Sequence, residues 1–161
     1  MSDILCIYYS RTGNTKKAMG EIAAALDAEL VEIRDAVERS GWKGWLACGR
    51  DSMRKTTQPL SHFDTDKPLD RYKLVIVGTP VWAGRCSSPA RTFLKTYGKQ
   101  LQNAAYLVTR SSEGRYQEVY DQMDRYVPGG HRAAVSLRMG SVGYVFWKDE
   151  FLRQVRDFLG A

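Results

Sequence analysis

Five short apolar runs, each bounded by polar residues, recur along the chain and predict β-strands. They occupy residues 3–9, 29–34, 72–78, 103–109 and 132–138. The run at 29–34 alternates apolar and polar positions, as a half-exposed strand does. The run at 72–78 is almost continuously apolar and ends in glycine, which is typical of a strand buried on both faces.

Between these runs, apolar residues recur at helical spacing and predict helices over 14–28, 88–98, 114–126 and 149–160. In the second of these, Ser88 is expected to be the N-cap, Pro89 lies in the first turn and Gly98 ends the helix. The last helix is expected to bury one face and to carry acids in its first turn. That face holds Phe151, Val155, Phe158 and Leu159.

Strands that alternate with helices predict a single α/β domain over residues 1–161, with a parallel sheet covered on both faces. Five strands favour the doubly wound order 2-1-3-4-5, whose ligand crevice lies at the carboxyl ends of the strands. Two segments are harder to place. Residues 40–55 carry Trp42, Trp45, Leu46 and Met53 at helical spacing, and we expect the two tryptophans in the core. Residues 139–147 fit a loop, a hairpin arm or a continuation of the last strand.

Composition narrows the function classes. The chain of 161 residues is 43% apolar and 26% charged, as globular domains are. It has no apolar run of membrane-spanning length and no signal-peptide pattern at its start, so we expect a cytoplasmic protein. Its three scattered cysteines are expected to be reduced thiols. With two histidines, a zinc site is not expected, and no side chain stands out as a nucleophile or general base.

The net charge of +6 is unevenly distributed. No acid occurs between Asp70 and Glu113, a stretch that we call the basic window. It carries Arg71, Lys73, Arg85, Arg91, Lys95, Lys99 and Arg110. No nucleic-acid-binding motif accompanies it, so we expect an acidic or anionic partner rather than nucleic acid.

The turn after the first predicted strand is unusually rich in hydrogen-bond donors. It consists of Ser10, Arg11, Thr12, Gly13, Asn14 and Thr15. Backbone N–H groups at such a turn, with the positive end of the following helix, can bind an anion without any charged side chain. The alternative is an ordinary N-cap by Asn14 or Thr15. We favour the anion because one capping residue would be enough, and the turn has four residues of this kind.

Other phosphate-binding patterns do not fit this turn. It lacks the GxxxxGK[ST] of a triphosphate loop and the GxGxxG of a dinucleotide site. Cys86 and Arg91 are one residue too close for the pattern of a small tyrosine phosphatase. These exclusions leave a monophosphate held by hydroxyls and amides.

The stretch YSRTGNT resembles the phosphate loop of the flavodoxin family, which holds the phosphate of flavin mononucleotide (FMN). A second stretch, VIVGTPVWAG at 75–84, resembles the loop in which an aromatic residue packs on the flavin ring; Trp82 takes that position. The resemblance implies that Thr79, Pro80, Val81, Ala83 and Gly84 line the ring edge. It also implies that Thr109, Arg110, Ser111 and Ser112 approach the pyrimidine side. Arg11 is expected to point to solvent, and Arg85 and Arg110 to lie near the flavin.

The resemblance implies a flavodoxin-like three-layer sandwich and an FMN-binding redox protein that passes electrons to a protein partner or a small acceptor. The stretch at 109–114 departs from the family, because it has one glycine where many relatives have two. Tyr116 is one candidate for the outer aromatic cover of the ring. Two other functions stay open: a binding module that has lost FMN, and an NAD(P)H-dependent, quinone-type FMN reductase. The sequence does not set the oligomeric state.

Overall fold

The computed structural model describes residues 2–35, 40–53, 59–114 and 116–160. Its central sheet has parallel strands in the order β2-β1-β3-β5-β6. Their bounds are Ile4–Tyr8 for β1, Glu29–Glu32 for β2, Leu74–Trp82 for β3, Ala104–Arg110 for β5 and His131–Arg138 for β6. This is the predicted doubly wound order. Over the described residues, no helix is both long and apolar enough to cross a bilayer.

A short strand that the sequence did not predict extends the sheet. Strand β4, Arg85–Cys86, folds back on the end of β3 and pairs with it in antiparallel fashion. Trp82 thereby lies opposite Arg85 in the ladder. The sheet therefore has six strands instead of five.

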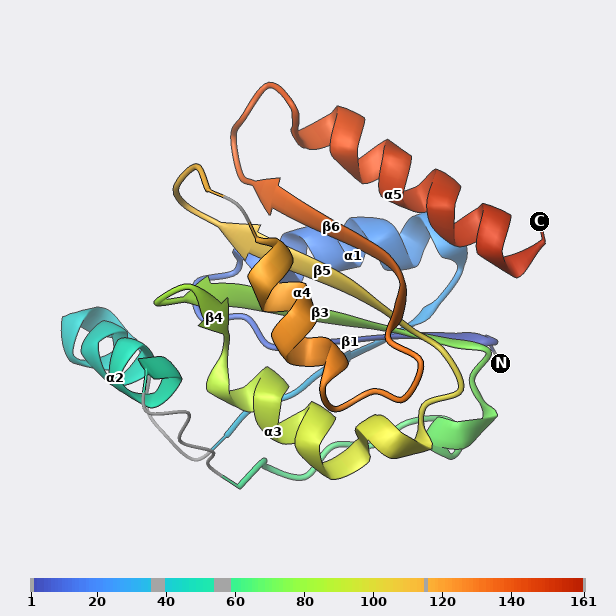
Figure 1. Ribbon diagram of the computed structural model, residues 1–161, viewed down its shortest axis with the longest axis horizontal. Helices are drawn as coiled ribbons and strands as arrows, with labels where there is room; N and C mark the ends of the chain where they lie inside the picture. Colours follow the sequence, from blue (N-terminus) through green and yellow to red (C-terminus); the bar gives the residue numbers. More distant parts are fainter. Residues whose placement is uncertain (1, 36–39, 54–58, 115, 161) are drawn as a thin grey trace.

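Helices cover the two faces of the sheet (Figure 1). Helices α1, Asn14–Leu26, and α5, Tyr144–Leu159, pack on one face, where Met19, Ile76 and Phe151 belong to one buried cluster. Helices α3, Ser88–Tyr97, and α4, Gln117–Asp124, pack on the other, where Val77, Phe93 and Tyr106 belong to a second cluster. Short 3-10 turns at Leu69–Arg71 and Gly98–Gln100 precede β3 and β5. The result is the expected three-layer sandwich.

Two helix starts differ from the sequence prediction. Ser87, and not Ser88, caps α3, because its side chain accepts the Ala90 amide at 3.3 Å. Helix α5 begins at Tyr144, five residues earlier than predicted, so its first turn contains no acid. The segment 139–147 is therefore a loop at 139–143 followed by the first four residues of this helix. Phe158 lies off the buried face and is 39% exposed.

Helix α2, Gly41–Met53, differs most from the prediction. Trp42 and Trp45 are 70% and 63% exposed, so the expectation that the two tryptophans lie in the core was wrong. Leu46 is 50% exposed as well. The face that packs on the domain is made of small or polar residues, Gly44, Cys48 and Asp51. The side chain of Met53 and residues 54–55 lie outside the described part of the structure. In Figure 1, α2 lies beside β4, at the edge of the molecule.

Candidate functional site

Three segments meet at the carboxyl ends of neighbouring parallel strands. The turn 10–15 follows β1, residues 80–84 contain the end of β3, and residues 109–111 contain the end of β5. The strands are in register there, because Tyr8 pairs with Gly78 and Pro80 pairs with Thr109. They enclose a cleft of about 170 Å³, which we call the polar cleft. It is lined by Ser10, Arg11, Thr12, Asn14, Thr15, Trp45, Pro80, Val81, Trp82, Thr109, Arg110 and Ser111.

The turn 10–15 leaves the first amides of α1 without a side-chain acceptor. Gly13 is the N-cap with a φ of 99°, a conformation that glycine adopts without steric cost. Its amide donates to Ser10 Oγ at 3.0 Å, which closes the turn. Among the described residues, no side chain caps the helix, so the alternative of an N-cap by Asn14 or Thr15 was wrong. Open amides together with a helix dipole can bind an anion.

The hydroxyls of Thr15 and Thr109 join two of the three segments. Their oxygens are 2.8 Å apart, and both side chains are buried. Each hydroxyl carries one proton, and the hydrogen bond between them uses only one of the two protons. The second proton can therefore point into the polar cleft. Thr12 and Asn14 are exposed at the rim of the same cleft.

Arg11 has a partner that the sequence did not suggest. Its Nη2 donates to the Gly41 carbonyl oxygen at 3.0 Å, at the start of α2. The expectation that Arg11 points to solvent was therefore wrong, because its guanidinium links the turn 10–15 to the helix beside it.

A tight hairpin between β3 and β4 holds Trp82. Its two loop residues, Ala83 and Gly84, have φ values of 49° and 74°, as a two-residue turn matched to the strand twist requires. Ala83 adopts this left-handed conformation at a cost of about 1–2 kcal/mol, and such strain often occurs at functional sites. Trp82 is 7% exposed and packs edge-on against Tyr9, with ring centroids 5.4 Å apart. Its orientation is therefore fixed by the core.

Five of the predicted site residues do not line the polar cleft. Ala83 lines a neighbouring cleft, and the other four shape the segments around the site. Gly13 and Gly84 provide the two turns. Thr79 is buried, and its hydroxyl accepts the Ser87 amide at 2.9 Å, which secures the hairpin. The Ser112 carbonyl accepts hydrogen bonds from Arg110 at 2.7 Å and from the Tyr116 hydroxyl at 3.3 Å.

A second, more apolar cleft lies next to the first. It has a volume of about 350 Å³ and shares Trp45, Val81 and Trp82 with the polar cleft. Its other lining residues are Leu46, Cys48, Gly49, Arg50 and Ala83. We call it the apolar cleft. Sequence reasoning missed Trp45, because helical spacing identifies an apolar face without showing which way it points. The small residues on the opposite face of α2 were the available signal.

Cys86 is not a nucleophile in this arrangement. Its side chain is buried, and burial raises the pKa of the thiol to about 11 despite the nearby Arg91 guanidinium. At neutral pH the group therefore remains a neutral thiol. Arg91 is itself buried and donates to the carbonyl oxygens of Cys86 and Asp51, each at 3.4 Å.

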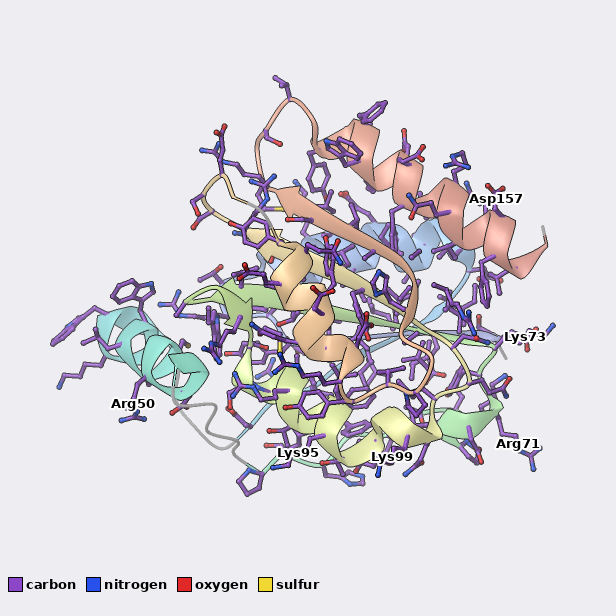
Figure 2. All side chains as sticks on the ribbon, in the orientation of Figure 1. Arg50, Arg71, Lys73, Lys95, Lys99 and Asp157 are labelled. Carbon is purple, nitrogen blue, oxygen red and sulfur yellow. The ribbon has the colours of Figure 1, made fainter. Side chains whose placement is uncertain are left out.

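Only part of the basic window lies near the clefts. Figure 2 shows Arg71 and Lys73 at the opposite end of the molecule from α2, with Lys95 and Lys99 along α3 and the turn after it. The physical reason is that parallel strands begin at the edge opposite the one where they end, and Arg71 and Lys73 immediately precede β3. Of the window's cations, Arg110 lines the polar cleft and Arg85 pairs with Trp82.

Comparison with known proteins defines the fold. No family model matches the sequence, and neither does any curated protein. Among solved structures, a flavoprotein from Lactobacillus acidophilus in complex with FMN is 21% identical over 91% of this chain and 99% of its own, with a TM-score of 0.66. A protein described as a flavoprotein from Bacteroides uniformis is 18% identical over 96% and 98%, with a TM-score of 0.74. A WrbA-like flavodoxin from Agrobacterium tumefaciens is 18% identical over 98% and 99%, with a TM-score of 0.60.

These likenesses show that the chain is an α/β protein with the flavodoxin-like fold. The order of strands and helices predicted the doubly wound sheet, and the resemblance of residues 9–15 and 75–84 to the flavodoxin family implied this fold.

The bond between Thr15 and Thr109 makes a testable prediction about stability. Thr15→Val or Thr109→Val alone should cost about 1–3 kcal/mol of unfolding free energy, because the remaining buried hydroxyl loses its partner. The double variant should cost little more than one single variant, since both polar groups are then gone. Chemical denaturation measures all three values. Fully additive losses would show that the hydroxyls do not depend on each other.

Proposed function

We propose that this protein binds FMN and works as a redox protein, transferring electrons to a protein partner or to a small acceptor at the flavin edge. One observation carries the proposal: an uncapped helix start forms a polar cleft that continues, through Trp45, Val81 and Trp82, into an apolar cleft. FMN has the same two parts, a charged phosphate and a flat aromatic ring.

The donor set at the turn 10–15 fits a phosphate. A buried anion must be matched by hydrogen-bond donors, and charge-assisted bonds from preformed amides do this well. The amides of the first turn of α1, the Thr12 hydroxyl and the free proton of the Thr15–Thr109 pair are available for it. The turn needs no lysine, because the helix dipole and the amides supply the positive potential.

The lining of the apolar cleft fits the ring. Trp82, which packs against Tyr9, borders this cleft together with Val81 and Ala83, and the three offer apolar contact to a ring. The exposed backbone of Ala83 and Gly84 can hydrogen-bond to ring nitrogens. When bound, the flavin supplies the electron-transfer chemistry, and the polypeptide provides orientation, access and electrostatics.

The cations near the clefts support an acidic or anionic partner. They come from several elements: exposed Lys43 and Arg50 on α2, Arg85 on β4, and exposed Lys16 and Lys17 in the first turns of α1. We also propose a reducing, cytoplasmic location, because Cys6, Cys48 and Cys86 are buried, free thiols.

The visible spectrum of the purified protein tests the proposed function. The expected result is flavin absorption at a 1:1 ratio, either as purified or after addition of FMN. If FMN does not bind at all, the proposal is wrong and the flavin-free binding module is favoured. Rapid bleaching by NADPH alone would instead identify an FMN reductase.

A second prediction concerns the phosphate. Thr12→Ala should weaken FMN binding about tenfold, because it removes a hydroxyl donor to a charged acceptor. Riboflavin, which lacks the phosphate, should bind the parent more weakly and be insensitive to the change. Thr92→Ala is the matched control, since the Thr92 hydroxyl donates to the Ser88 carbonyl on α3, outside both clefts. Equal affinities of the parent for FMN and riboflavin would contradict a phosphate site.

A third prediction concerns the partner. Electron transfer to an anionic acceptor should slow as salt rises, and the double variant Lys43→Glu, Arg85→Glu should lose most of that dependence. Stopped-flow rates with an anionic acceptor and with a cationic acceptor of similar potential measure the effect. A faster rate with the cationic acceptor at low salt would refute the acidic or anionic partner.

A further inference from the structure

We propose that helix α2 supplies the second aromatic wall of the ring site through Trp45, and that Arg11 holds this helix in place over the cleft. The inference rests on the proposed function, because it specifies where the flavin ring lies. It assigns the outer wall to a helix that follows the second strand, and not to the segment after β5.

The first argument comes from the reversed orientation of α2. A helix on a globular domain normally turns its large apolar residues inward, because burying them stabilises the fold by about 25 cal/mol per Å². Helix α2 instead packs on the domain through Gly44, Cys48 and Asp51, and it exposes Trp42, Trp45 and Leu46. The small residues bring the helix close to the domain, and its large side chains stay available for another surface.

The second argument separates the two exposed tryptophans. Trp45 lines both clefts, opposite the hairpin that carries Trp82, whereas Trp42 lines neither. The apolar cleft, at about 350 Å³, falls within the size range of about 300–1,000 Å³ that is usual for ligand pockets. The polar cleft alone, at about 170 Å³, is below that range. A ligand with both a phosphate and a ring would therefore extend from the first cleft into the second, with its ring between Trp82 and Trp45.

The third argument removes the competing aromatic residue. Tyr116, at the start of α4, lines neither cleft. Its ring lies under the Arg110 guanidinium at 5.3 Å, and its hydroxyl donates to the Ser112 carbonyl at 3.3 Å. These contacts engage Tyr116 within its own loop, so it does not provide the cover that the sequence suggested.

The fourth argument concerns how α2 is held. At its start, Arg11 donates to the Gly41 carbonyl at 3.0 Å, and Gly41 has a φ of 68°, which favours glycine. Near its end, the buried Arg91 donates to the Asp51 carbonyl at 3.4 Å. The same turn that forms the polar cleft therefore also positions the helix that carries Trp45. Arg11 acts here as a positioning residue and not as a phosphate ligand.

Matched tryptophan variants test the ring wall. Trp45→Ala should weaken binding of FMN and of riboflavin by the same factor, about tenfold, because the two ligands share the ring. It should also raise the residual fluorescence of bound flavin. Trp42→Ala, three residues away on the same helix, should keep both affinities within twofold of the parent, and Trp45→Phe should restore most of the loss. Far-UV circular dichroism and the thermal midpoint check that each variant is folded.

The outcomes separate this inference from the proposed function. If the parent binds no flavin, the proposed function is wrong and the inference with it. If the parent binds FMN but Trp45→Ala binds both ligands as tightly as the parent, only the ring-wall inference is overturned. Equal losses in Trp45→Ala and Trp42→Ala would also overturn it, because they would report a general effect on α2.

Arg11→Ala tests the positioning role. Riboflavin has no phosphate, so a variant that acts through α2 should weaken riboflavin and FMN by similar factors. A loss confined to FMN would mean that Arg11 binds the phosphate directly, and it would overturn the positioning role. Arg11→Ala combined with Trp45→Ala should bind riboflavin no more weakly than Trp45→Ala alone, since Arg11 then has no ring wall left to position.

Discussion

The left-handed turn at Gly13 leaves the first amides of α1 without side-chain acceptors, and the rest of the site is arranged around that feature. Such amides need an anion or water as their acceptor. The fold places them at the carboxyl edge of a parallel sheet, where the ends of β3 and β5 also lie. The Thr15–Thr109 bond then fixes the distance between two of the three segments. If these amides bind an anionic group at one end of the cleft, as we propose, they determine where the remainder of the ligand can lie.

Two elements of different character border the apolar cleft, where the rest of such a ligand would lie. The β3–β4 hairpin is rigid, since its two-residue turn and the Trp82–Tyr9 contact hold the indole in one orientation. Helix α2 is attached to the domain through a small-residue face and through backbone carbonyls that accept from Arg11 and Arg91. Its bulky side chains therefore face the cleft and solvent. This contrast supports a site with one wall fixed by the core and one wall provided by a helix on the surface.

Much of this arrangement could be predicted from the sequence, because strand and helix periods are local properties. The carboxyl end of each strand identifies the site edge once the sheet is known to be parallel, and this pointed to the turn that contains Thr15. The resemblance to the flavodoxin family added Trp82 and Thr109. Strand β4 has two residues, too few to leave a pattern. The direction in which the Trp45 face points depends on the surface that α2 packs against. The helical periodicity of the sequence carries no information about that surface. The basic window is divided between two ends of the molecule for a related reason. Residues just before β3 and residues just after it are close in sequence, but the strand separates them in space.

A crystal structure of the protein with FMN tests the central claim most directly. The account predicts the phosphate within hydrogen-bonding distance of the amides at the start of α1, and the ring against Trp82 in the apolar cleft. A phosphate bound elsewhere, with the amides of residues 14 and 15 facing water, would contradict it.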